Sequence, residues 1–155
     1  MYYRLSLICV CLCTIVLSGC TPGTSTMLSD TIDSRYKVGQ VWRYQTRTDE
    51  ADSTFSIVKV EHDAKLGIIV HISLRGLHIK NPHHPNGFTD TASHMPFAED
   101  AITKSVTTLV QENAPLPDFQ AGYNQWRQAA DAGKAGIFTI TVAESLDVME
   151  QALNK

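Results

Sequence analysis

The amino-acid sequence predicts an α+β domain, in which a curled antiparallel sheet of three to five strands packs against two or three helices. Two observations indicate this class. Short β-type runs separated by polar turns follow one another after residue 37, and apolar residues at helical spacing come later. Runs of strands followed by runs of helices are typical of α+β domains. The expected order is β-β-β-(β)-α-α-β-α, in a single domain over residues 37–155.

Two strands are expected first. Residues 41–46 combine aromatic and β-branched side chains, which favour extended structure. A polar turn then leads to a second strand over residues 53–61. Its alternation of apolar and polar residues slips near Ile57 and Val58, which predicts a β-bulge at that point.

The third strand, over residues 68–75, has the clearest alternation in the chain. Its polar face carries His71 and Arg75 with Ser73 between them, and a cation beside a titratable group is a candidate anion-binding surface. An ordinary sheet face, in contact with water or covered by a helix, explains the same pattern. Residues 77–79 are a candidate continuation of the sheet, and the short connections indicate antiparallel pairing.

The following region is expected to be mainly helical. Residues 81–93 contain two prolines and a glycine without periodicity, which predicts a loop. A helix over about 98–112 starts after Pro96, with apolar residues at i, i+4, i+7 and i+8. A second helix is expected over about 118–132, with Gly133 as its left-handed cap.

The last predicted elements are a strand and a helix. Residues 136–141 are expected to return to the sheet with Phe138 and Ile140 facing inward. Thr141 and Glu144 have the spacing of a capping box, which predicts the start of a closing helix. The apolar stripe of that helix consists of Leu146, Met149 and Leu153.

The first 19 residues have the pattern of an export signal. Arg4 gives the start a positive charge, and the thirteen residues from Leu5 to Leu17 contain no charged side chain. As a helix this stretch would be about 20 Å long, which is too short for the roughly 30 Å hydrocarbon core of a bilayer. A basic start, a short apolar stretch and small residues at its end are typical of a cleaved secretory signal.

The motif Leu17-Ser18-Gly19-Cys20 resembles the lipobox of bacterial lipoproteins, in which a leucine and two small residues precede an obligatory cysteine. The resemblance implies that residues 1–19 are a lipoprotein signal peptide and that Cys20 carries the lipid, palmitate included. Thr21 is similar to the class sorted to the outer membrane, which implies a place in the bacterial cell envelope, facing the periplasm. An uncleaved anchor and a plain signal peptide are the alternatives. No cysteine follows Cys20, so no disulfide is expected.

Residues 20–36 are expected to form the lipidated N-terminus and a flexible tether, because small and polar residues dominate them. Such a tether would reach about 20 Å. The whole chain has a net charge of −3, and loss of Arg4 makes the remainder more negative. This balance argues against a nucleic-acid partner. The expected partners are the membrane, through the lipid on Cys20, and an envelope protein.

Four histidines are weak candidates for a metal site, because they fall within 17 residues around the proline-rich loop: His78, His83, His84 and His94. Imidazole is a common metal ligand, but the spacing matches no zinc motif, and an exposed polar loop explains the same residues. The sequence has no G-x-S-x-G motif and no phosphate-binding glycine loop. It therefore predicts no catalytic residue and no cofactor, and a non-enzyme is favoured over an enzyme.

Four further segments are similar to a family of uncharacterised bacterial proteins, a resemblance that covers residues 38–153. They are VWRYQTR (41–47), VHISLRGLHIKNP (70–82), HMPF (94–97) and GKAGIFTITVAE (133–144). The resemblance favours a single domain and implies no activity. Three functions stay open: a non-catalytic binding or structural module on the membrane, a metal-binding protein or metal-dependent hydrolase using the histidine loop, and a periplasmic immunity lipoprotein.

Overall fold

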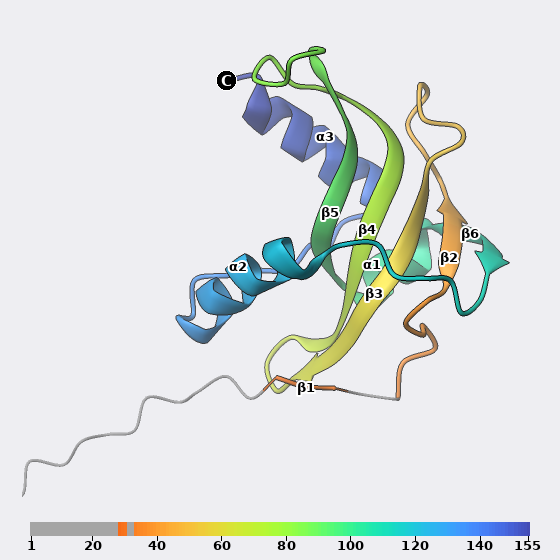
Figure 1. Cartoon of the computed structure of the whole chain (residues 1–155). Helices are drawn as coiled ribbons and strands as arrows, with labels where there is room; N and C mark the ends of the chain where they lie inside the picture. The colour runs from red at the N-terminus through yellow and green to blue at the C-terminus, as the bar shows by residue number, and fades with distance from the viewer. Residues whose placement is uncertain (1–27, 31–32) are drawn as a thin grey trace, which may run out of the picture.

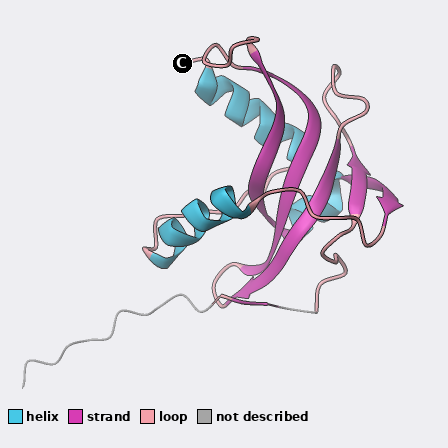
Figure 2. Ribbon diagram, viewed as in Figure 1, coloured by secondary structure: helices cyan, strands magenta, loops and turns pink. Residues whose placement is uncertain are grey.

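The computed structural model describes residues 28–30 and 33–155, and this part of the chain forms one antiparallel sheet of six strands with three helices (Figures 1 and 2). The α+β class is confirmed, with one strand more than the sequence predicted. The elements are β1 (Ser29–Asp30), β2 (Val41–Tyr44), β3 (Thr54–Asp63), β4 (Gly67–Lys80), β5 (Phe88–Ala98), α1 (Glu99–Ser105), β6 (Val106–Gln111), α2 (Gln120–Asp131) and α3 (Val142–Leu153).

The sheet has the strand order β5-β4-β3-β2-β6, and the short β1 pairs with the end of β3. A bulge interrupts the long β3–β4 ladder, as the sequence predicted. Ile57 pairs with Ile72 and Lys59 pairs with His71, so Val58 has no partner in the register. The bulge reverses the alternation of β3. Phe55 and Ile57 therefore face one side of the sheet while Lys59 and the residues at every second position after it face the other.

The three helices lie on both sides of the sheet. Figure 1 shows α1 and α3 behind the long strands, and α2 with the loop before it in front of them. The side of α1 and α3 holds the hydrophobic core, in which Ile102 and Leu146 are fully buried. The strands contribute side chains of similar burial to this core: Phe55, Ile57, Val70, Ile72, Leu74, Ile79 and Phe97.

The prediction of a loop over residues 81–93 is wrong for the second half of this range, which belongs to β5. The turn is confined to the residues before Phe88, and Gly87 adopts a positive φ of 74° there. Most of β5 is polar and lacks apolar alternation, because it is an edge strand. Pro96 fits this strand because it lies at an edge, where a missing backbone N–H is tolerated.

The helix predicted over about 98–112 is also too long. α1 ends at Ser105, and the next six residues form β6, which pairs with β2. The apolar spacing that suggested a helix includes Val110, which is 51% exposed. Valines and threonines make up most of β6, and their β-branched side chains favour a strand.

The strand predicted over residues 136–141 is reduced to one parallel bridge between Phe138 and Phe97. Phe138 packs inward as predicted, with its ring centroid 5.1 Å from that of Phe97, whereas Ile140 is 38% exposed. The caps of the last two helices are confirmed. Gly133 follows α2 with a φ of 67°, and Thr141 forms a capping box at the start of α3.

The described residues before β2 belong to the packed domain, although a tether was expected there. Ser29 and Asp30 pair with β3, and Tyr36 is 1% exposed in the core. The lipid-attachment residue Cys20 lies outside the described residues. In the described ranges, no helix combines the length and the apolar character needed to cross a bilayer.

An ion-pair cluster around Arg47 joins the β2–β3 turn to β4 and α3. Glu50 is 2% exposed, and its Oε1 accepts hydrogen bonds from the Arg47 guanidinium and, at 2.7 Å, from the backbone N–H of His78. Arg47 also contacts two carboxylates of α3, Glu150 at 3.1 Å and Asp147 at 3.3 Å.

Glu50→Ala should lower the free energy of unfolding by about 3 kcal/mol, because it leaves a guanidinium and a backbone N–H without their buried acceptor. Asp147→Ala is the matched control. Its carboxylate is 56% exposed, so we expect a loss below about 1 kcal/mol. Urea unfolding measures both, and equal effects would contradict the buried role of Glu50.

Candidate functional site

The sheet face under α2 carries polar residues in two rows that cross the strands. In the first row, Arg75 of β4 pairs with Thr54 of β3 on one side and with Thr91 of β5 on the other. In the second row, Ser73 pairs with Ser56 of β3. On the β5 side the register shifts between Ile72 and Leu74, so Ser93 and His94 both lie opposite Ser73.

These rows form the floor of a hollow of about 310 Å³, which we call the hydroxyl hollow. The segment that leads from β6 to α2 forms its wall, and Figure 1 shows this segment crossing in front of the long strands. The lining residues are Ser56, Ser73, Leu74, Arg75, Thr91, Ser93, Pro115, Leu116, Pro117 and Asp118.

The polar groups of the hydroxyl hollow are largely unused within the described part of the chain. Arg75 donates from Nε to Thr54 Oγ1 at 3.1 Å, and no group of residues 28–30 or 33–155 pairs with its two terminal nitrogens. Asp118 accepts a hydrogen bond from the backbone N–H of Gln120 at 3.3 Å. Four hydroxyls of the lining have no hydrogen-bond partner among the described residues, those of Ser56, Ser73, Thr91 and Ser93.

A buried cluster of a carboxylate and two imidazoles lies beside the hollow. Glu61 is 3% exposed and His71 is fully buried. His71 Nε2 lies 3.1 Å from Glu61 Oε2, and His71 Nδ1 lies 2.8 Å from His94 Nε2. The second contact requires a proton between two imidazoles. The arrangement that satisfies both contacts with neutral rings has His71 Nε2–H facing the carboxylate and His94 Nε2–H donating to His71.

Helix α2 completes this cluster from above. Tyr123 donates its hydroxyl to Glu61 Oε1 at 2.8 Å, and Arg127 lies 3.6 Å from the same oxygen. The Trp126 ring packs edge-on against the His71 ring, with ring centroids 4.8 Å apart. Gly122 allows this close approach, because a Cβ there would lie only 2.8 Å from the Cβ of His94.

The protonation states follow from burial and from these contacts. Burial lowers the pKa of His94 to about 4, and repulsion from His71 adds to the effect. Burial also lowers the pKa of His71, despite the opposing influence of Glu61. For Glu61, burial acts to raise the pKa, but the close contact with His71 and the hydrogen bond from Tyr123 outweigh it and the pKa is lowered. At neutral pH the cluster therefore holds an ionised Glu61 and two neutral imidazoles, with His71 between the carboxylate and His94.

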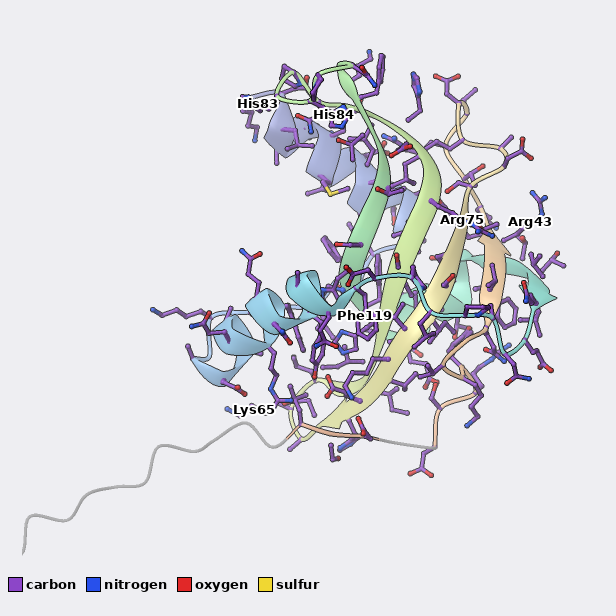
Figure 3. All side chains as sticks on the ribbon, in the orientation of Figure 1. Arg43, Lys65, Arg75, His83, His84 and Phe119 are labelled. Carbon is purple, nitrogen blue, oxygen red and sulfur yellow. The ribbon has the colours of Figure 1, made fainter. Side chains whose placement is uncertain are left out.

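The four histidines considered for a metal site do not come together. His78 stacks on Phe88 with ring centroids 4.0 Å apart. Figure 3 shows His83 and His84 at the tip of the β4–β5 turn, far from Phe119 at the start of α2, whereas His94 belongs to the cluster under α2. Over residues 28–30 and 33–155, no group of three His, Cys, Asp or Glu side chains is placed to share a metal ion.

The sequence pattern indicated part of this site. His71, Ser73 and Arg75 lie on one face of β4 as predicted, and a helix covers that face. Glu61 was missed, although the predicted bulge contained the necessary signal. Because the bulge reverses the alternation of β3, it moves Lys59 and Glu61 to the face of His71.

Comparison with known proteins gives no match: no family model, curated protein or solved structure is significantly similar to this chain.

The cluster should make the fold sensitive to acid. The folded-state pKa of His94, about 4, lies below the unfolded value near 6.5, so the unfolded chain binds the proton first. Stability is then complete above about pH 6.5 and falls as the pH drops toward 4. Because His94 is partly exposed, we expect a contribution of about 1–2 kcal/mol.

His94→Gln, which keeps an N–H donor for His71, should make this decline shallower. The exposed turn residue His83 offers the control His83→Gln, which should leave the decline unchanged. Urea unfolding at several pH values between 7 and 4 measures the effect. If the free energy of unfolding of His94→Gln falls with pH as steeply as that of the wild type, the acid sensitivity does not come from this imidazole.

Proposed function

We propose that this chain is a bacterial cell-envelope lipoprotein, anchored through a lipid on Cys20, whose folded domain is a non-catalytic binding module. The motif Leu17-Ser18-Gly19-Cys20 supports the anchor, because it combines a lipobox pattern with an apolar stretch too short for a bilayer. The outer membrane, facing the periplasm, is the proposed location on the basis of Thr21.

The lipid accounts energetically for membrane attachment. Each buried CH₂ group contributes about 0.8 kcal/mol, and two acyl chains hold a protein stably where one holds it only marginally. A diacylglyceryl cysteine supplies two chains, so the domain needs no apolar surface of its own to stay at the membrane.

The observation that carries the binding role is the hydroxyl hollow. Its hydroxyls and the terminal nitrogens of Arg75 have no partner in the part of the chain that the structure describes, and they line a space of about 310 Å³. This volume is at the lower end of the range for small-molecule pockets, about 300–1,000 Å³. Converging polar groups that the protein does not use itself are available to a ligand.

The surroundings of the hydroxyls in the hollow favour binding over nucleophilic catalysis. An attacking hydroxyl needs a base within hydrogen-bond reach. The nearest imidazoles, His71 and His94, contact each other, and in the described chain no hydroxyl of the hollow hydrogen-bonds with an imidazole or a carboxylate. The serines are placed as donors and acceptors rather than as activated nucleophiles.

Cys20→Ala should abolish incorporation of labelled palmitate and should release the protein from the membrane fraction of expressing bacteria. Cys13→Ala, which removes a thiol from the export segment, should retain both the label and the membrane attachment. Gel fluorography and fractionation measure the two properties. Palmitate labelling that persists in Cys20→Ala would contradict the anchor.

Ser73→Leu should fill the hydroxyl hollow and abolish ligand binding there. We expect ligand-observed NMR with a panel of small sugars and organic acids to identify compounds that bind the wild-type domain and not this variant. Val148→Ser, on the exposed surface of α3, is the control and should keep the binding. Binding that Ser73→Leu does not alter, or no binding to any compound, would contradict the proposal.

A further inference from the structure

We infer that the hydroxyl hollow binds an anion, a carboxylate or phosphate group held by the terminal nitrogens of Arg75 and by the surrounding hydroxyls. This inference rests on the proposed binding role and names the class of ligand for it.

Arg75 is the cation that lines the hydroxyl hollow, and no carboxylate of the described residues neutralises its charge. Lys59 pairs with Asp30 and lies 3.6 Å from Glu61. Arg127 pairs with Asp131 at 2.9 Å and also lies near Glu61. Within the described ranges, the one side-chain partner of Arg75 is the neutral hydroxyl of Thr54. A positive charge at the edge of the hollow is therefore available to a ligand.

The sheet also orients this guanidinium. Thr54 is 7% exposed and stands directly opposite Arg75 in the β3–β4 ladder. Its hydroxyl accepts the Nε–H of Arg75 at 3.1 Å and so limits rotation of the guanidinium plane. The two terminal nitrogens remain as a planar fork, which matches the two oxygens of a carboxylate or phosphate.

The rest of the hollow supplies further donors at the right positions. Each free hydroxyl can donate one hydrogen bond, and those of Ser56, Ser73 and Ser93 lie in neighbouring positions on three adjacent strands. Asp118 is the one carboxylate of the lining, and it accepts a hydrogen bond from the first N–H of α2. The start of a helix carries a partial positive charge, which offsets that of Asp118.

A second concavity on this side of the sheet, of about 600 Å³, is a weaker candidate for an anion. Its lining includes the cations Lys37 and Lys59 and the carboxylate of Asp30. The Lys59 ammonium pairs with Asp30 and lies near Glu61, so an anion at Lys59 would have to compete with two carboxylates.

The test measures binding of inorganic phosphate and of succinate to the mature chain by isothermal titration calorimetry, with N-acetylglucosamine as a neutral probe. We expect at least one anion to bind and Arg75→Gln to weaken it tenfold or more. Arg75→Lys, which keeps the charge and loses the fork, should weaken it less. Arg43→Gln is the control, because Arg43 is an exposed cation of β2 outside the hollow.

The outcomes separate the two proposals. A higher affinity for phosphate or for succinate identifies the class of oxyanion. A tenfold or greater loss of that affinity in Arg75→Gln supports the inference. If only N-acetylglucosamine binds, and Ser73→Leu abolishes that binding, the binding role stands and the anion is excluded. If no probe binds, or if Arg75→Gln and Arg43→Gln weaken anion binding equally, the inference fails. Circular dichroism of each variant confirms that the fold is unchanged.

Discussion

The β-bulge at Val58 is the constraint on which the two-sided architecture depends. Without it, Lys59 and Glu61 would lie on the same face as Phe55 and Ile57 and would enter the apolar core beside Ile72. An ionised carboxylate in such a core costs several kcal/mol. The bulge moves both charges to the opposite face, where imidazole, phenol and guanidinium groups receive them. One extra residue in β3 thus separates the hydrophobic side from the polar side.

On the polar side of the sheet, Glu61 links α2 to the strands. Its carboxylate contacts His71 of the sheet and Tyr123 and Arg127 of the helix, so that one anion links both layers. Buried ion pairs add little net stability, but removal of one partner is costly. The cluster is therefore better understood as a device that specifies the position of α2 than as a source of stability. Gly122 contributes by letting the helix backbone approach His94 closely.

The sequence predicted the elements in which local and tertiary preferences agree. β2, β3 and β4, the bulge, α2 and the capping box at Thr141 are present near the predicted residues. β5 and β6 were missed because edge strands need no apolar alternation, and the edge position also makes room for Pro96. The face with His71, Ser73 and Arg75 could be predicted from alternation within β4. The association of Glu61 with His94 could not, because it depends on the register of three strands, including one that was predicted as a loop.

The ion pairs near β1 do not extend to the hydroxyl hollow. Asp30 of β1 pairs with Lys59, and Glu61 together with Asp131 occupies Arg127. These pairs neutralise Lys59 and Arg127 at one end of the polar face, where β1 pairs with β3. Arg75 lies on β4 six residues before the β4–β5 turn begins, beyond the reach of these carboxylates. Arg75 is thus a cation of this face that no carboxylate of the described residues neutralises.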